Sequence, residues 1–203
     1  PCLLSTRNFE PLYNVACVLR AFALIQARYP EATLTLVGAG SQDTALRALA
    51  SELALKNVTF AGQVAPGEIA GYYAAADLYL QAPSIDNMPL SVLEAFASGL
   101  PVVSTAVGGV PTILTDGVHG LLAPDDDAEA LATQVVRLLE QPDYARQLAA
   151  QARETCLRYD WPVVREGWLA AYRSAITSAG TPRQSDRRLP AAEPESAEIR
   201  ETT

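Results

Sequence analysis

Apolar positions along the chain alternate between short runs typical of strands and longer stretches with the spacing of helices. The short runs predict strands at residues 3–6, 33–37, 58–60, 78–81, 102–105 and 120–122. The helical spacing predicts helices at residues 13–28, 42–54, 67–76, 89–98, 127–140, 144–158 and 161–176, with a short helical turn at 108–111. Strands and helices therefore alternate along most of the chain.

This alternation predicts an α/β fold. Strands joined by helices of this length need right-handed crossovers, which build a parallel sheet with helices on both faces. We therefore expect one Rossmann-like, doubly wound domain over residues 1–177, with a helical C-terminal extension. From residue 178 onward large apolar residues become rare among Pro, Arg, Glu, Ser and Thr. That composition predicts a disordered tail at residues 178–203.

Composition and charge narrow the classes of function. Hydrophobic residues make up 49% and charged residues 19% of the 203 residues, which is ordinary for a globular domain with a proper core. The formal net charge of −8 argues against a nucleic-acid partner, because phosphate contacts need clustered lysine and arginine. No apolar run approaches the roughly 18–20 residues of a membrane span, so no transmembrane segment is expected.

The cysteines and the start of the chain give two further expectations. Cys2, Cys17 and Cys156 are widely spaced and form no Cys-x-x-Cys motif. We therefore expect neither a disulfide framework nor a thiolate metal site, and a reducing, cytoplasmic location. The segment from Pro1 to Ser5 lacks the features of a signal peptide and looks like the first strand of a domain cut from a longer protein.

Two candidate sites are weak. Gly38-x-Gly40 follows a predicted strand, as in dinucleotide-binding folds, but the third glycine of that fingerprint would fall at Asp43. A tight strand-to-helix turn explains these glycines, although they would also let a phosphate approach the backbone. The single histidine, His119, is flanked by turn glycines and is expected to be a loop residue. No metal site is predicted.

The segment from Asp86 to Glu94 is the strongest candidate. Two carboxylates flank seven residues directly after a predicted strand, and the second lies in a helix that leads into another strand. This places them at the carboxyl edge of a parallel sheet, where open α/β sheets bind nucleotides. A structural explanation competes, because Ser91-x-x-Glu94 is a capping box, Pro89 suits a first helical turn, and Asp86 suits the turn before it.

Together with its surroundings, this segment resembles the C-terminal domain of the family-4 retaining glycosyltransferases (glycosyl transferases group 1), which have the two-domain GT-B fold. The resemblance runs from about Leu3 to Tyr172 and depends on motifs that occur in a fixed order. These motifs are Ser5-Thr6-Arg7, Leu34-x-Leu36-Val37-Gly38-x-Gly40, Val58-x-Phe60-x-Gly62, Tyr73-x-x-Ala76-Asp77, Pro83-Ser84, Glu94-Ala95-x-Ala97-x-Gly99-x-Pro101-Val102-Val103, Gly108-Gly109-x-Pro111, Asp116-Gly117-x-x-Gly120-Leu121-Leu122 and Trp161.

The resemblance implies how a nucleotide-sugar donor would bind. Glu94 would accept hydrogen bonds from the ribose hydroxyls, since an ionised carboxylate can accept from both. Asp86 would face the donor sugar, and Arg7 would clamp the diphosphate. Residues between the carboxylates would present backbone N–H groups, helped by the positive helix N-terminus. The implied donor-binding residues are Arg7, Gly38, Gly40, Asp86, Asn87, Met88, Leu90, Ser91 and Glu94.

Four positions depart from the family pattern. Asp86 is one methylene shorter than the usual glutamate, and Tyr13 stands where a diphosphate-binding lysine is usual. Thr112 replaces a common glutamate, and Pro89 removes one N–H group from the donor loop. Losing a cation beside a pyrophosphate is expected to weaken donor binding or to move that task elsewhere, since charge-assisted contacts are the strong ones.

The resemblance also implies an activity. It is the hexosyltransferase-like transfer of a sugar from a UDP- or GDP-linked donor to an acceptor, with retention of anomeric configuration. In the family, the acceptor site and the usual catalytic histidine lie on an N-terminal domain, which we expect these 203 residues not to include. We therefore expect the donor-binding half, inactive alone, with that domain as its partner. No cofactor or metal is expected, and peripheral membrane association of the longer protein is compatible with the resemblance.

Two alternatives stay open. One is a non-catalytic nucleotide-sugar-binding module, which the departures at Tyr13 and Thr112 favour. The other is a different GT-B or Rossmann enzyme, such as a sugar-nucleotide epimerase. The incomplete dinucleotide fingerprint argues against a nicotinamide enzyme.

Overall fold

A single parallel sheet organises the first part of the chain. The computed structural model describes residues 1–179, which fall into two units, Pro1–Asp160 and the segment that begins at Trp161. The strands are β1 (Cys2–Ser5), β2 (Thr33–Val37), β3 (Val58–Gly62), β4 (Leu78–Leu80), β5 (Val102–Thr105) and β6 (Leu121–Ala123). They pair in parallel in the order β3-β2-β1-β4-β5-β6. This is the doubly wound order of nucleotide-binding folds, so the predicted fold class is confirmed.

Helices connect these strands and continue after β6. They are α1 (Val15–Arg28), α2 (Asp43–Glu52), α3 (Ile69–Ala74), α4 (Leu90–Ala97), α5 (Val110–Ile113), α6 (Ala128–Glu140) and α7 (Pro142–Cys156), with short 3₁₀ turns η1 (Pro11–Tyr13) and η2 (Leu157–Tyr159). The predicted strands at 33–37 and 102–105 have the observed bounds, and the other elements differ by at most three residues at either end. The alternating pattern was therefore a sufficient guide to the elements.

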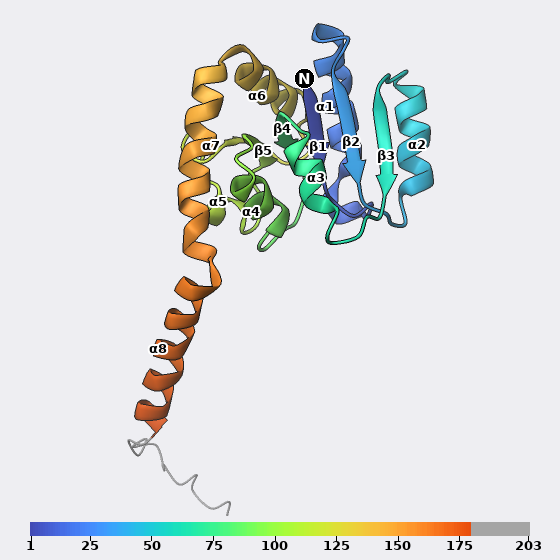
Figure 1. The fold of residues 1–203 in the computed structure, drawn as a ribbon. Coiled ribbons are helices and arrows are strands. Elements are labelled where there is room, and N and C mark those ends of the chain that lie inside the picture. Colours follow the sequence, from blue (N-terminus) through green and yellow to red (C-terminus); the bar gives the residue numbers. More distant parts are fainter. Residues whose placement is uncertain (180–203) are drawn as a thin grey trace, which may run out of the picture. The chain divides into compact units, whose positions relative to one another are not determined.

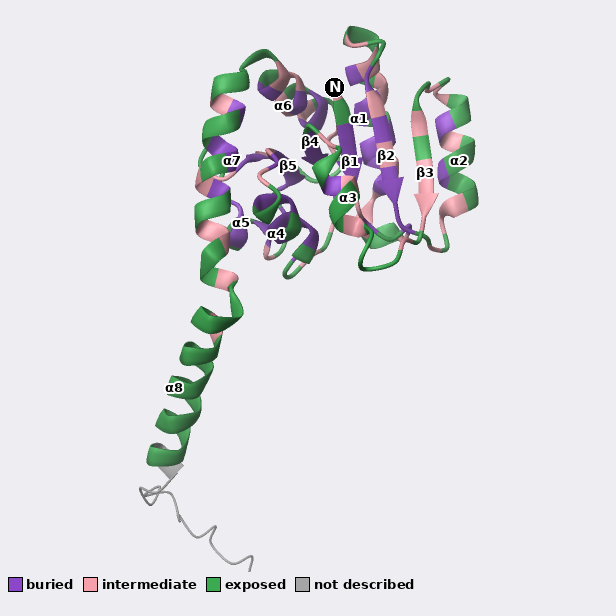
Figure 2. Ribbon diagram, in the orientation of Figure 1, coloured by how far each residue is buried: buried purple, intermediate pink, exposed green. Residues whose placement is uncertain are grey.

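The helices cover both faces of the sheet (Figure 1). One core cluster joins α1, α2 and α6 to one face and includes Phe22 and Leu34. The other joins α3, α4 and α5 to the opposite face and includes Tyr79 and Phe96. Every residue of β4 and β5 is buried, as expected for central strands covered on both sides. Figure 2 shows this buried interior along the central strands, with exposed residues on the outer sides of the helices.

The winding of the sheet changes direction between β1 and β4. From β1 the chain moves outward through β2 to β3, then returns to β4 beside β1 and continues to β6. Loops that follow two such neighbours leave in opposite directions and open a crevice at the carboxyl edge. Arg7 follows β1 and Asp86 follows β4, so two residues 79 positions apart in sequence meet at this edge.

The second unit contains α8 (Trp161–Ala179), which is described by itself. The rings of Trp168 and Tyr172, one turn apart, stack with centroids 5.8 Å apart. The predicted tail starts at residue 178, but α8 extends to Ala179 and the rest of that prediction lies outside the described residues. Within residues 1–179, no helix combines the length and apolar character that crossing a bilayer requires.

Candidate functional site

A cavity of about 340 Å³ opens at the carboxyl edge of the sheet, beside β1 and β4. Its lining comes from the segment after β1 and from the loop and helix after β4. The lining residues are Thr6, Arg7, Tyr13, Asp86, Met88, Pro89, Leu90, Ser91 and Glu94. Six of the nine residues predicted to bind the donor therefore lie together: Arg7, Asp86, Met88, Leu90, Ser91 and Glu94.

Arg7 is the one cation in this lining. Its side chain is 91% buried and already contacts several protein groups. Its Nη2 forms an ion pair with Asp86, whose side chain is only 10% exposed. Its Nη1 donates to Ser91 Oγ at 2.9 Å, and its Cζ lies 4.0 Å from the centroid of the Tyr13 ring. These contacts offset part of the cost of removing an arginine from water, but among the described residues the buried Nε has no hydrogen-bond partner.

A chain of hydrogen bonds continues from Arg7 into the sheet. Ser91 Oγ, which accepts from Arg7, donates to Gln81 Oε1 at 3.1 Å. Gln81 Nε2 in turn donates to Ser104 Oγ at 3.0 Å. Gln81 and Ser104 are fully buried, so each needs such a partner. The chain connects the position of Arg7 to the packing of β4 against β5.

Glu94 is exposed at the rim of the cavity, and a hydrogen bond from Tyr73 orients its carboxylate. The Tyr73 hydroxyl donates to Glu94 Oε2 at 2.7 Å and lies 2.7 Å from Thr6 Oγ1. Burial raises the pKa of Tyr73, so its hydroxyl stays protonated and can donate to the carboxylate. One oxygen of Glu94 is thus held by the protein, while its exposed side faces the solvent and any ligand.

The capping-box prediction for Ser91 and Glu94 is wrong. Pro89 occupies the N-cap of α4, and no side chain caps the helix start. Ser91 instead forms hydrogen bonds with Arg7 and Gln81, and Glu94 forms one with Tyr73. Both side chains therefore bind partners from other elements and not the N–H groups of their own helix. The first N–H groups of α4 are therefore left without a side-chain acceptor at the mouth of the cavity.

Gly108 and Gly109 shape the loop that carries Asp86. The Gly109 N–H donates to the Asp86 carbonyl at 2.7 Å. A Cβ built on Gly109 would overlap the carbonyl oxygen of Asn87, and one on Gly108 would overlap that of Asp86. In the sequence this glycine pair is a landmark of the family resemblance, and two consecutive glycines are also a signal for close backbone contact.

The other three predicted donor-binding residues do not line the cavity. Asn87 is exposed, and its carbonyl faces Gly109. Gly38 and Gly40 lie beneath the segment that follows β1, where a Cβ on Gly38 would overlap the Arg7 carbonyl and one on Gly40 would overlap the Phe9 carbonyl. The structure therefore gives these glycines a third use, a close crossing of two backbone segments, beside the tight turn and the phosphate approach predicted from the sequence.

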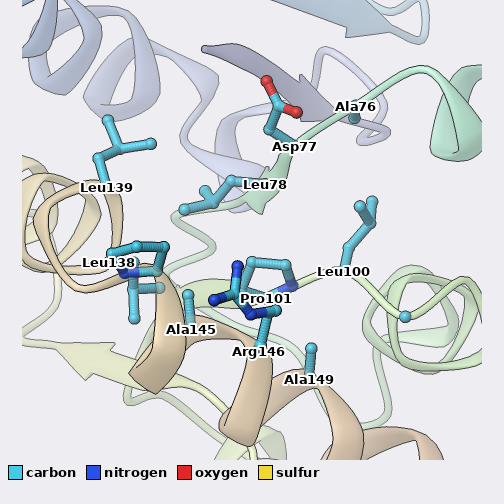
Figure 3. A pocket seen from close by; sticks show the side chains of 12 residues that line it. Ala76, Asp77, Leu78, Leu100, Pro101, Leu138, Leu139, Ala145, Arg146 and Ala149 are labelled. Atoms are coloured by element: carbon cyan, nitrogen blue, oxygen red, sulfur yellow. The ribbon is translucent and has the colours of Figure 1, made fainter.

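A larger cavity, of about 420 Å³, lies at the opposite edge of the sheet (Figure 3). It is lined by residues at the start of β4, before β5, and on α6 and α7, including Leu78, Pro101, Leu138 and Arg146. In the close-up, the carboxylate of Asp77 points away from Arg146. Because parallel α/β sheets bind ligands at their carboxyl ends, we place the candidate site at the smaller cavity.

His119 lies in the loop before β6, as predicted, and is partly buried. Its Nδ1 accepts from the Thr115 N–H at 3.3 Å, so the neutral ring carries its proton on Nε2, which lies 3.1 Å from Thr155 Oγ1. Burial, together with the charge of Arg158, lowers the pKa of His119. No group of three or more metal-ligating side chains occurs among the described residues.

These contacts predict how stability depends on pH. Protonation would turn Nδ1 into a donor that faces another donor, so the folded chain binds this proton less readily than the unfolded chain. The contribution of His119 is therefore complete above about pH 6.5 and is lost as the pH falls below that value. The melting temperature of the unaltered chain should exceed that of His119→Gln by more at about pH 8 than at about pH 5. A difference that widens on acidification would contradict this assignment.

The sequence is similar to that of known glycosyltransferases. The family model of glycosyl transferases group 1 matches residues 1–155. A phosphatidyl-myo-inositol mannosyltransferase of Mycolicibacterium smegmatis is 33% identical over 176 residues, covering 86% of this chain and 45% of that protein. A D-inositol 3-phosphate glycosyltransferase of Frankia alni is 34% identical over 187 residues, covering 87% and 46%. The chain thus spans about half the length of the curated relatives it matches.

A solved structure extends the comparison to the fold. Anabaena Alr3699/HepE, crystallised in complex with UDP-glucose, superposes with a TM-score of 0.78 at 24% identity. The match covers 85% of this chain and 48% of that one.

Proposed function

Because the chain belongs to the glycosyl transferases group 1 family, we propose that it is the donor-binding half of a glycosyltransferase and that the cavity at β1 and β4 holds a nucleoside-diphosphate sugar. The observation that carries this proposal is the grouping of a buried arginine, an exposed carboxylate and an uncapped helix start at one cavity. That grouping offers one contact for each part of such a donor.

In this proposal Glu94 binds the ribose. Its carboxylate is exposed and is fixed by a hydrogen bond from Tyr73 at 2.7 Å. A carboxylate held in this way can accept hydrogen bonds from two vicinal hydroxyls, which would otherwise need two separate acceptors. The complex of Alr3699/HepE with UDP-glucose supports a donor of this chemical class in the same fold.

Arg7 and the start of α4 bind the diphosphate. The guanidinium supplies a permanent charge at the cavity, and the uncapped N–H groups at the start of α4 supply donors and the positive end of a helix dipole. Asp86, which pairs with Arg7, faces the donor sugar. Since Asp86 and Glu94 are both acidic, the lining carries one cation and two anions before the ligand arrives. The helix dipole must therefore offset part of the repulsion.

The reaction would take place against a further domain of the whole protein. Cleavage of the bond between sugar and diphosphate leaves negative charge on the diphosphate, which Arg7 and the α4 N–H groups stabilise. The acceptor and a catalytic histidine would come from an N-terminal domain, and the sugar would be transferred with retention. The relatives that act on inositol derivatives support an acceptor reaction of the whole protein, which this half alone does not perform.

The role of Glu94 can be tested by calorimetric titration with UDP, GDP and their 2′-deoxy forms. The unaltered chain should bind the better of the two ribonucleotides roughly tenfold more tightly than its deoxy form, because a hydrogen bond to a charged group is involved. Glu94→Gln should lose most of this preference. Glu129→Gln, which removes an exposed carboxylate in the first turn of α6, serves as the matched control and should keep it.

Two outcomes would count against the proposal. If no nucleoside diphosphate binds, the cavity is not a donor site. If binding occurs but the full-length protein forms no glycoside with any donor, the alternative of a non-catalytic binding module is favoured. The excess of acidic groups in the lining is the observation that makes this alternative worth testing.

A further inference from the structure

The guanidinium of Arg7 is held from three directions. Asp86 pairs with Nη2, Ser91 accepts from Nη1 at 2.9 Å, and the ring of Tyr13 lies 4.0 Å from Cζ. The first two contacts use the N–H groups that a phosphate would also use. The third contact is with the π-face of the ring and uses no N–H group. It is therefore the contact that can persist unchanged when an anionic ligand engages the arginine.

Tyr13 is itself fixed in place. It is the last residue of η1, and its N–H donates to the Glu10 carbonyl at 3.0 Å. The next residue, Asn14, adopts a left-handed conformation with φ of 42°, and its side chain accepts from the Cys17 N–H at 3.2 Å. The ring of Tyr13 is partly buried and packs against the core cluster that contains α1. A ring anchored in this way restricts the plane of the guanidinium beside it.

We infer that Tyr13 is a positioning residue for Arg7 in the proposed donor site. It adds no charge, although the family pattern has a lysine at this position. Instead it holds the guanidinium plane so that its N–H groups stay directed at the cavity when a diphosphate displaces Asp86. Bidentate binding of phosphate depends on that orientation, because the guanidinium is planar and its donors are fixed in direction. This inference rests on the proposed function, and it assigns a further residue to the site.

The test compares the phosphates with the nucleoside. Affinities of Tyr13→Leu and Tyr13→Phe would be measured for UDP or GDP, whichever the unaltered chain binds more tightly, and for the parent nucleoside. Tyr13→Leu should weaken diphosphate binding about tenfold, equivalent to about 1.4 kcal/mol, and leave nucleoside binding unchanged. Tyr13→Phe keeps the ring and should retain the affinity for the diphosphate.

Tyr144→Leu is the matched control. The ring of Tyr144 lies 5.0 Å from Cζ of Arg137, which gives the same kind of contact away from the cavity. This variant should lose stability without any change in nucleotide affinity. Equal losses for nucleoside and diphosphate in Tyr13→Leu would mean a structural role only, and would overturn the inference. A loss in Tyr13→Phe as large as in Tyr13→Leu would overturn it as well.

The outcomes separate this inference from the proposed function. If the unaltered chain binds the nucleoside diphosphate and Tyr13→Leu binds it equally well, the role of Tyr13 fails while the donor site stands. If the unaltered chain binds neither UDP nor GDP, the proposed function fails and the role of Tyr13 fails with it.

Discussion

Replacing Gly109 with alanine is expected to weaken nucleotide binding strongly while the sheet remains folded. The added Cβ would overlap the carbonyl oxygen of Asn87, which is backbone and cannot rotate away as a side chain would. The loop from Asp86 to Met88 must therefore shift, and with it the hydrogen bond from the Gly109 N–H to Asp86. Such overpacking costs about 1–3 kcal/mol of stability, but the displaced Asp86 and Met88 belong to the cavity lining. Titration with UDP and GDP should show affinity reduced by at least about 100-fold.

Gly71→Ala gives the matched control for this substitution. Gly71 lies in α3, and a Cβ there meets nothing within 4 Å. Alanine is the better helix former, so this variant should be at least as stable as the unaltered chain and should bind nucleotides equally well. Unchanged binding by Gly109→Ala would show that the glycine pair does not set the shape of the site.

Replacing Arg7 with methionine is expected to reduce both stability and binding. Asp86 would keep a side chain that is only 10% exposed but would lose its counter-ion. Removing one partner of a buried ion pair typically costs about 3–5 kcal/mol, because the remaining charge is uncompensated. The loss of the one cation in the cavity lining should also remove diphosphate binding. Urea unfolding and calorimetry would measure the two effects separately.

A double substitution distinguishes these effects. Adding Asp86→Asn to Arg7→Met removes the stranded charge, so part of the stability should return while diphosphate binding does not. Arg47→Met is the control on the surface, since the pair of Arg47 with Asp43 is exposed and should contribute little. If Arg7→Met were no more destabilising than Arg47→Met, the ion pair with Asp86 would not be a buried one in solution.

The elements of the fold could be predicted from the local pattern, because a strand that is buried on both faces has a continuous run of apolar and β-branched residues. Residues Val102 to Thr105 are wholly buried, and their β-branched run predicts the observed strand without help from other parts of the chain. The same is true of α1, whose buried residues recur at helical spacing. General rules for crossovers also predicted a parallel sheet with helices on both faces, but the strand order was not predicted and comes from the structure.

The site was harder to predict because its partners come from distant elements. Ser91 and Glu94 have the spacing of a capping box, and no local feature indicates that Arg7 and Tyr73 will engage them instead. The role of Tyr73 could have been suspected, since a buried tyrosine needs a partner for its hydroxyl. The cation–π contact of Tyr13 with Arg7 lies in an irregular segment that leads into the left-handed turn at Asn14, and the path of such a segment is not revealed by spacing alone.

The measurement that tests the donor site most directly is an NMR titration of the isotope-labelled chain with UDP and GDP. Binding is monitored through the chemical-shift changes of the backbone amides. We expect the largest shifts at Arg7, Leu90, Ser91 and Glu94, which line the cavity at β1 and β4. The cavity at the opposite edge provides an internal reference through Leu138 and Ala149. Shifts centred on those two residues, or no shifts with either nucleotide, would contradict the assignment of this site.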